Sequence, residues 1–324
     1  MSIIFLDFSY SGCIILSSQT KSLGGLNKQQ PNRRYHMALK AKQPEAVKPS
    51  KPKFLISGES GVGKTFFALS FPKPYLIDVE GGATRKQYQD KLKKVGGAYF
   101  GKEEGSQDFA SVNEEVKQLV TQKHEYKTLI IDSFSYLYML EAAIAEQDVG
   151  SAFGADKREA QKPTKQLIRW LEKLDMTVIL ICHSKGKWVR KGKEIYQDGN
   201  TFDGWDKLEY LLDLWVEIQN GRKTFLIRKS RIDSLPQNDS MPLSYGNFAD
   251  VYGADVIEAP AVPADLATKE QIAKINKLNE LLNTEEAQIA KWFKKVDVDS
   301  WEEMTVKQID GLIELLTKKI EEVK

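Results

Sequence analysis

The amino-acid sequence predicts an α/β fold, with a core domain built on a mostly parallel sheet and a small all-α C-terminal domain. Within residues 52–257, short apolar runs alternate with helical patterns, which is the order of elements in a parallel sheet covered by helices on both faces. A Pro/Ala-rich linker then occupies residues 258–267. Beyond it, residues 268–324 show apolar residues at helical spacing, which predicts a separate domain of short helices.

The N-terminal segment differs from the core in composition. Residues 1–19 are apolar, but Asp7 interrupts them and no basic segment precedes them, so we expect neither a signal peptide nor a membrane anchor. Residues 20–51 are polar and rich in Lys, Gln and Pro, which is typical of disordered segments. Met37 begins a stretch that looks like a natural protein start. We therefore expect residues 1–51 to be a disordered or non-native extension.

The overall composition is that of an ordinary soluble protein. Of the 324 residues, 41% are hydrophobic and 28% are charged, and the formal net charge is +2. Any affinity for nucleic acid must therefore come from a local basic patch and not from the net charge. Cys182 lies in an apolar run, where we expect a reduced core thiol and not a disulfide or a metal ligand. A reducing cytoplasm is the predicted location.

The first core strand leads into a glycine-rich turn and then a helix, in the stretch FLISGESGVGKTFFALSF at residues 54–71. Residues 58–65 fit G-x-x-x-x-G-K-[ST], the P-loop, in which glycines take positive φ values and turn backbone N–H groups toward phosphate oxygens. Lys64 is the candidate contact to the β- and γ-phosphates of a nucleotide, and Thr65 is a candidate Mg²⁺ ligand. The alternative is an ordinary glycine-rich turn. The predicted nucleotide-binding residues are Gly58, Glu59, Ser60, Gly61, Val62, Gly63, Lys64, Thr65 and Phe66.

Further strands and helices follow in alternation. A second strand ends in the acids of KPYLIDVEGG, residues 73–82, and a long polar stretch comes after it. Residues 211–233 contain two alternating apolar runs around Asn220-Gly221, a strong signal for a β-hairpin that would extend the sheet. Between these segments we expect, in chain order, a helix at 109–122, a strand ending at Asp132, a polar loop at 146–163, a helix at 164–175 and a strand at 176–184.

The C-terminal domain contains capping-box patterns, in which a Ser or Thr is followed three residues later by Glu or Gln. They occur at Thr268/Gln271, Ser300/Glu303 and Thr305/Gln308. In such a box, each of the two side chains accepts a hydrogen bond from the other residue's backbone N–H group. We therefore expect a helix to begin at each of these positions.

Three polar side chains follow apolar strands, at the edge where a doubly wound sheet places its ligand. Asp132 ends the strand TLIIDS and is a candidate Mg²⁺ ligand together with Thr65; the alternative is a helix N-cap or a turn residue. Glu80 is a candidate for orienting the water that attacks the γ-phosphate, or else a solvated loop acid. His183 is a candidate sensor of the γ-phosphate, or else a structural histidine.

The order of the segments GESGVGKT, LIDVEGG, LIIDS, LICHSK and FLIRKSR resembles the RecA/Rad-type recombinase core. In particular, the sequence is similar to the compact phage-encoded RecA-like P-loop ATPases that are grouped with the Sak single-strand annealing proteins. The resemblance covers roughly residues 52–250, and the P-loop is its only sharply specific motif. It implies a RecA-like P-loop NTPase core that binds ATP with Mg²⁺.

The same resemblance assigns roles to individual residues. Asp78-Val79-Glu80 matches the family pattern that ends in the catalytic glutamate, which implies this role for Glu80. Asp132-Ser133 matches the end of the Walker B strand. His183 stands where RecA itself carries a glutamine, a departure that keeps a polar donor at this position.

A basic pair follows the last predicted strand of the core. Lys229 and Arg231 match the pair that RecA-like subunits insert into the ATP site of a neighbour; the alternative is a solvated pair of charges on an edge strand. The resemblance thus implies a homo-oligomer, a ring or a filament, with ATP at the interface between subunits. The predicted catalytic residues are Lys64, Glu80, Asp132, His183, Lys229 and Arg231.

A basic segment with one aromatic residue, SKGKWVRKGK at residues 184–193, follows His183 and contains no acidic residue. Basic side chains can follow the phosphates of a single strand while an aromatic ring stacks on its bases. By the resemblance, this segment would be a mobile DNA-binding loop, with residues 148–162 as a second one; the alternative is a solvated basic hairpin. The predicted DNA-binding residues are Lys185, Lys187, Trp188, Arg190, Lys191 and Lys193.

Together these features predict an ATPase, stimulated by single-stranded DNA, that acts in phage-type homologous recombination or strand annealing in the cytoplasm of the host cell. Two alternatives stay open. One is a helicase or helicase-loader-type ATPase on the same core, although the sequence has no evident extra helicase domain. The other is a nucleotide-gated adaptor that binds a partner such as single-strand-binding protein through residues 268–324. None of the three involves a membrane.

Overall fold

The computed structural model describes residues 41, 49–219, 221 and 223–323. The predicted N-terminal extension, residues 1–51, therefore lies almost entirely outside the described part of the chain. The elements named below belong to the compact unit Lys48–Lys324. Within the described residues, no helix has both the length and the apolar character needed to cross a membrane.

Eight strands of the described residues form the central sheet, in the order β10-β9-β8-β1-β5-β4-β2-β3. The strands from β8 to β3 in this order pair in parallel, whereas β9 and β10 pair antiparallel. The predicted α/β fold with a mostly parallel sheet is thus confirmed. The strands are β1 (Lys53–Ser57), β2 (Pro74–Asp78), β3 (Ala98–Phe100), β4 (Thr128–Asp132), β5 (Thr177–Ile181), β8 (Leu214–Gln219), β9 (Thr224–Ser230) and β10 (Ser240–Pro242).

The predicted hairpin extends this sheet. β8 pairs with β1, and β9 returns antiparallel beside β8. Gly221 in the connection has a φ of 58°, in the left-handed region that favours glycine. Asn220, the other residue of the predicted turn, lies outside the described residues.

Helices cover both faces of the sheet because both faces of its strands are apolar. On β1, Leu55 packs into the apolar cluster on one face, while Phe54 and Ile56 pack into the cluster on the other. The first cluster also contains residues of α3 (Phe109–Thr121), α4 (Phe134–Val149), α5 (Ala155–Lys173) and α6 (Leu208–Leu211). The second contains residues of α1 (Lys64–Ala68), α2 (Lys86–Val95), α7 (Tyr245–Tyr252) and α8 (Ala254–Glu258).

Two elements form in the long polar stretch after the second strand, where we predicted none. α2 follows β2, and β3 then pairs with β2 at the edge of the sheet. α2 is amphipathic, but most of its residues are polar and only Leu92 is buried. β3 has only three residues, none of them fully buried. Neither element therefore stands out from the polar stretch around it.

The predicted loop at residues 146–163 is wrong. Only residues 150–154, which include the 3₁₀ turn η1 (Ala152–Gly154), separate α4 from α5. α5 continues through Pro163, although a proline inside a helix costs about 3 kcal/mol. Ala160 and Thr164, on either side of this proline, are buried against the core, and such burial offsets the cost.

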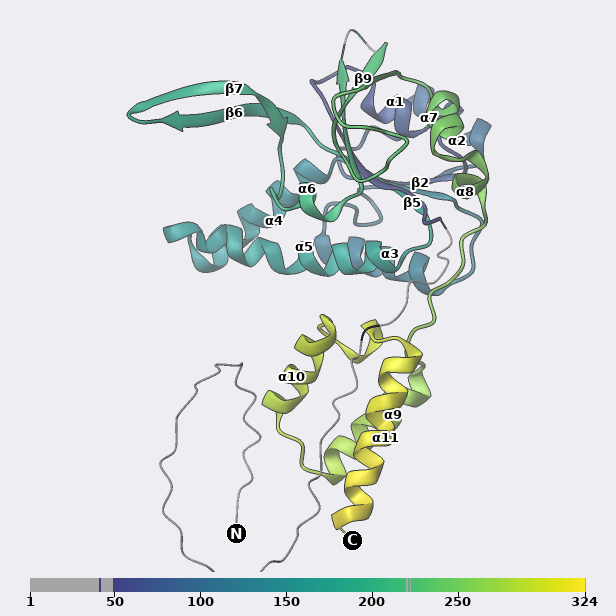
Figure 1. Cartoon of the computed structure of the whole chain (residues 1–324), viewed down its shortest axis with the longest axis vertical. Helices are drawn as coiled ribbons and strands as arrows, with labels where there is room; N and C mark the ends of the chain where they lie inside the picture. The colour runs from purple at the N-terminus through teal and green to yellow at the C-terminus, as the bar shows by residue number, and fades with distance from the viewer. Residues whose placement is uncertain (1–40, 42–48, 220, 222, 324) are drawn as a thin grey trace, which may run out of the picture. The chain divides into compact units, whose positions relative to one another are not determined.

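The basic segment forms a two-stranded antiparallel ribbon that is separate from the central sheet and projects from it in Figure 1. It consists of β6 (Ser184–Lys191) and β7 (Glu194–Phe202), and Gly192 in the turn has a φ of 65°. Along the ribbon the side chains are exposed or half-buried, except for Phe202 at its base. We call this element the β6–β7 ribbon.

The C-terminal region is helical, as predicted. It contains α9 (Lys269–Leu281), α10 (Glu286–Val296), the 3₁₀ turn η3 (Trp301–Glu303) and α11 (Val306–Val323). These elements share an apolar cluster of their own, which includes Ile275, Ile309 and Leu316. Their burial against one another stabilises helices that would be marginal alone.

Two of the predicted capping boxes form. Thr268 and Gln271 make both reciprocal bonds. The Gln308 side chain accepts from the Thr305 N–H at 2.8 Å, and the Thr305 hydroxyl accepts from the Gln308 N–H at 3.3 Å. The predicted box at Ser300/Glu303 is wrong, because the Ser300 side chain makes no capping bond. Glu303 is instead fully buried and pairs with Arg169 of α5.

Candidate active site

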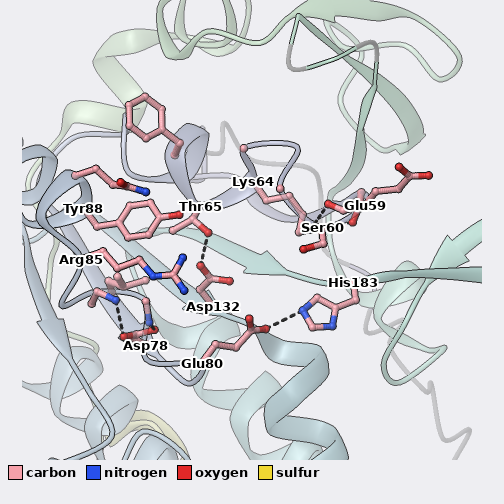
Figure 2. Close-up of a pocket in the computed structure, with 18 of the residues that line it drawn as sticks. Glu59, Ser60, Lys64, Thr65, Asp78, Glu80, Arg85, Tyr88, Asp132 and His183 are labelled. Carbon is pink, nitrogen blue, oxygen red and sulfur yellow. Dashed lines mark hydrogen bonds and ion pairs between the residues drawn. The ribbon is translucent and has the colours of Figure 1, made fainter.

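The carboxyl ends of four strands surround one pocket. β1 leads into the glycine-rich loop, and β2, β4 and β5 lead to Glu80, Asp132 and His183. The pocket has a volume of about 740 Å³, and its lining includes the glycine-rich loop together with all three of these side chains (Figure 2). The strand order thus brings together residues that the sequence separates widely.

The glycine-rich loop has the backbone that its sequence predicts. Gly61 and Gly63 have φ values of 76° and 95°, and Gly58 has a φ of 153°. A Cβ atom at Gly58 would lie only 3.0 Å from Val62 Cγ2 and 3.3 Å from the Ile218 carbonyl oxygen. The loop therefore requires glycine for its close approach to β8 and for its turns, and it forms a concave backbone that fits a phosphate group.

Lys64 lies across this loop. Its Nζ donates hydrogen bonds to the carbonyl oxygens of Gly58 and Glu59, each at 2.8 Å. Burial lowers the pKa of the Lys64 ammonium, while the nearby Asp132 and Glu80 carboxylates oppose that shift. An ammonium group held by carbonyl oxygens beside two acids is placed to bind an anion entering the loop.

Thr65 and Asp132, the two predicted metal ligands, lie in direct contact. Thr65 Oγ1 donates to Asp132 Oδ2 at 2.5 Å. Burial raises the pKa of the Asp132 carboxyl to about 6, although the hydrogen bond from Thr65 acts in the opposite direction. A hydroxyl and a carboxylate side by side at the edge of the phosphate loop are the oxygen ligands that fit Mg²⁺.

Glu80 forms a hydrogen-bonded chain on the other side of Asp132. Its Oε1 lies 2.7 Å from Nε2 of His183 and also accepts a hydrogen bond from the Ser133 hydroxyl. The Glu80 and His183 side chains are 43% and 46% exposed, so this pair can be reached from the pocket. Because the Glu80 carboxylate is exposed to the pocket and its partners lie outside the phosphate loop, it is placed to orient a water molecule there.

Asp78 has a structural role. It is buried, and its carboxylate accepts hydrogen bonds from the backbone N–H groups of Gly81, Gly82 and Ala83 at 2.9, 2.9 and 2.7 Å. These bonds fold the loop after β2 tightly and thereby place Glu80 at the rim of the pocket. In the segment Asp78-Val79-Glu80, the first acid thus holds the loop and the second faces the pocket.

Three of the predicted nucleotide-binding and catalytic residues, Val62, Lys229 and Arg231, do not line this pocket. Val62 packs against the core cluster beneath the loop. Lys229 Nζ donates to the carbonyl oxygen of Leu212, and Arg231 donates to that of Tyr210. This pair therefore lies at the end of β9 beside α6, away from the phosphate loop of its own chain.

The predicted DNA-binding residues all lie on the β6–β7 ribbon, which starts at the residue after His183. Trp188 is 66% exposed. The opposing strand β7 contains acidic residues, which segment 184–193 lacks. One of them, Glu194, pairs in register with Lys191. Lys185 also forms an ion pair with Asp203 at 3.1 Å. The ribbon as a whole is therefore less basic than β6 alone.

The base of the ribbon is tied to the site. The backbone N–H of Asp203 donates to the His183 carbonyl oxygen at 2.7 Å. Ser135 Oγ accepts from the His183 N–H at 2.9 Å and donates to the Asp203 carbonyl. Arg228 Nη2 donates to the Asn200 carbonyl oxygen at 3.1 Å. A movement of the ribbon at its base must therefore act on His183.

Sequence reasoning missed several residues that line the pocket. Arg85, Gln87 and Tyr88 come from the start of α2, in the stretch where no element was predicted. The sequence did offer one signal for Arg85, because this basic residue comes only five positions after Glu80, in the loop that follows β2. However, only the position of α2 shows that the Arg85 side chain lies in the pocket and not in solvent.

A family model described as an AAA domain matches residues 50–236, which is more than half of the 324 residues. The matched region contains the glycine-rich loop, Glu80, Asp132, His183 and the β6–β7 ribbon. No curated protein matches the chain. The family match indicates a P-loop ATPase-type domain, a class that binds nucleotide and typically uses Mg²⁺.

Proposed function

Because the chain belongs to the AAA domain family, we propose that it binds and hydrolyses ATP with Mg²⁺ and acts on single-stranded DNA. The process we propose is phage-type homologous recombination or strand annealing, in line with the resemblance to the RecA-like ATPases of the Sak group. The observation that carries the proposal is the direct contact between Glu80 of the pocket and His183, the residue that directly precedes the β6–β7 ribbon.

Each residue of the pocket has a task in this proposal. With a nucleotide bound, Lys64 would leave its carbonyl partners and bind the β- and γ-phosphates, and Thr65 and Asp132 are the residues that would hold the metal. Bound Mg²⁺ supplies neutralisation of phosphate charge. Glu80 orients the attacking water and accepts its proton. His183 holds Glu80 and senses the terminal phosphate.

The ribbon supports a site for single-stranded DNA. It presents exposed Trp188 together with basic residues on a two-stranded element that no other part of the described chain covers. An aromatic ring can stack on any base, and lysines and arginines follow the phosphates, so this contact would be independent of base sequence. Its fixed base at His183 offers a physical link from bound DNA to the hydrolysis of ATP.

The placement of Lys229 and Arg231 supports a homo-oligomer, a ring or a filament. These side chains contact carbonyl oxygens beside α6 and do not reach the pocket of their own chain. In an oligomer with ATP at the interface, they would lie near the nucleotide of the next subunit.

A second candidate function is a nucleotide-gated adaptor or helicase-loader-type ATPase recruited by single-strand-binding protein. It is favoured by a pocket of about 320 Å³ on the C-terminal helices, which Leu282, Trp292 and Leu316 line together with Thr284, Glu285, Gln288 and Lys319. A pocket with apolar residues among polar ones can accept a partner segment. In that case DNA would leave the rate of ATP hydrolysis unchanged.

Steady-state ATP hydrolysis by the full chain, with and without single-stranded DNA over a salt series, tests the proposal. We expect stimulation by DNA that weakens as salt rises, because phosphate contacts release counterions. Replacing both Lys187 and Lys191 with Gln should reduce the stimulation, whereas the same change at Lys274 and Lys277 of α9 should leave it intact. ATP hydrolysis without a response to DNA would favour the adaptor, and absence of hydrolysis would contradict the proposed ATPase.

A further inference from the structure

Arg85 is an unpaired cation in the pocket. Its side chain is exposed and lines the pocket, and within the described residues no ion pair or hydrogen bond engages its guanidinium group. Figure 2 shows this group extending toward the side chains of Thr65 and Asp132, from the side opposite the phosphate loop. It therefore faces the place where a metal and the terminal phosphates of a nucleotide would lie.

The acids around Arg85 already have other partners. Asp78 is held by backbone N–H groups, Asp132 accepts from Thr65, and Glu80 is engaged by His183. Within the described residues, no hydrogen bond or ion pair joins the Arg85 guanidinium group to any of these carboxylates, although all of them line the same pocket. The five N–H donors of Arg85 are therefore available to an anion from outside the chain.

The charge of the pocket points to the same anion. Among the residues that line it, the lysine and arginine side chains are those of Lys64 and Arg85, whereas the acids are Glu59, Asp78, Glu80 and Asp132. A polyphosphate in a pocket with this many acids needs more than one cation in addition to a metal ion. A guanidinium group also matches two phosphate oxygens at once, which an ammonium group cannot do.

The backbone of Arg85 is held in place. Its N–H donates to the Gly82 carbonyl oxygen at 3.1 Å, and its own carbonyl oxygen accepts from Tyr88 and Gln89 in the first turn of α2. Asp78 fixes the preceding loop. Arg85 thus starts from a rigid position on the rim, and its exposed side chain can adjust to a ligand.

Building on the proposed nucleotide site, we infer that Arg85 binds the terminal phosphates of the nucleotide held by its own chain. The second phosphate-binding cation is therefore supplied in cis, at the start of α2. Lys229 and Arg231, which do not line the pocket, are not needed for this contact. Arg85 favours a nucleoside triphosphate over the diphosphate, because the triphosphate extends further toward Thr65 and Asp132.

The test is equilibrium binding of ATP and ADP to the full chain in the presence of Mg²⁺, measured by calorimetry. Arg85→Gln should weaken ATP binding by about 10- to 100-fold, the range for losing a hydrogen-bonded contact to a charged group, and ADP binding by less. Lys86→Gln is the matched control, since Lys86 is adjacent and exposed but does not line the pocket. Arg85→Lys keeps the charge without the two-pronged donor, and its affinity should be intermediate.

Two outcomes would overturn the inference, and they are distinguishable. If Lys64→Ala loses ATP binding while Arg85→Gln and Arg85→Lys bind ATP like the wild type, the nucleotide site stands and the role of Arg85 does not. If the wild type binds no nucleotide, the proposed function fails and this inference with it.

A mixing experiment tests the cis assignment. Equal amounts of Lys64→Ala and Arg85→Gln chains should hydrolyse ATP no faster than the sum of the two alone, because each site lacks one of its own cations. Recovery of hydrolysis on mixing would mean that Arg85 acts on the nucleotide of a neighbour, and would overturn the assignment in cis.

Discussion

Nε2 of His183 lies 2.7 Å from Oε1 of Glu80, so the acid that faces the pocket is in direct contact with the residue that leads into the β6–β7 ribbon. His183 follows β5 and Glu80 follows β2, two strands of the sheet that β4 separates. A displacement at the base of the ribbon can therefore reach the acid through a single hydrogen bond. The predictions below test this contact and the surroundings of the pocket.

Replacing Glu80 with Gln should lower kcat for ATP hydrolysis by about 100-fold or more, while ATP binding is retained. The amide keeps the shape of the side chain but cannot accept the proton of the attacking water, and general-base catalysis contributes at least that factor. Steady-state hydrolysis and equilibrium ATP binding measure the two effects. Glu103→Gln, at an exposed residue that does not line the pocket, is the control. Hydrolysis by Glu80→Gln at the wild-type rate would assign the proton acceptor to another group.

Replacing His183 with Ala should reduce the response of hydrolysis to single-stranded DNA more than it reduces the rate without DNA. The change removes the bond between the ribbon and Glu80, so DNA bound to the ribbon can no longer act on the acid. The ratio of the rates with and without DNA is the measurement. His124→Ala serves as the control, because His124 contacts the Leu119 carbonyl near the end of α3 and does not line the pocket. An unchanged ratio would mean that the signal takes another path.

Replacing Asp132 with Asn should stabilise the metal-free protein at neutral and higher pH. Burial raises the pKa of Asp132 from 3.8 to about 6. Between these two pH values the folded protein therefore keeps a proton on Asp132 that the unfolded protein has lost. Its free energy of unfolding falls as the pH rises through this range. Above it the ionised, buried carboxylate carries a penalty of at most about 3 kcal/mol, which Asn lacks.

Chemical denaturation with a chelator at about pH 8 and about pH 5 measures this difference. The advantage of Asp132→Asn should be largest at the higher pH and should shrink at the lower one. Asp90→Asn, at an exposed residue of α2, should show no such dependence. An advantage of Asp132→Asn that is the same at both values would contradict the raised pKa.

Replacing Arg169 with Ala should destabilise the protein by about 3 kcal/mol, because it leaves the carboxylate of Glu303 buried without a partner. Arg169 Nε lies 2.7 Å from Glu303 Oε2; the Arg169 side chain is 11% exposed and that of Glu303 is 0% exposed. Adding Glu303→Gln to this variant should restore part of the stability. Lys318→Ala removes an exposed pair with Glu314 and should cost less than about 1 kcal/mol. If Arg169→Ala and Lys318→Ala lowered the free energy of unfolding in urea by the same amount, the buried pair of Arg169 and Glu303 would not have the predicted importance.

Much of the site could be predicted because its signals are local. The glycine-rich loop, the apolar strands and the acids at their ends each occupy a few consecutive residues, and the strands alternate with recognisable helices. The first part of α5 and all of α2 could not be predicted. α5 crosses Pro163, where packing outweighs the local preference. α2 buries only Leu92 among mostly polar residues, so its helical pattern does not stand out in the polar stretch.

The sequence by itself determined the conformation of the phosphate loop, since the positive φ values at Gly61 and Gly63 are preferences of individual residues. Only the tertiary structure decided which side chains meet there. Glu80 and His183 are 103 positions apart in the chain and come together through the order of the strands. Arg85 faces the pocket because α2 packs on the same sheet. The reason is physical: backbone preferences act over a few residues, whereas the partners of a side chain depend on how the whole sheet buries its apolar faces.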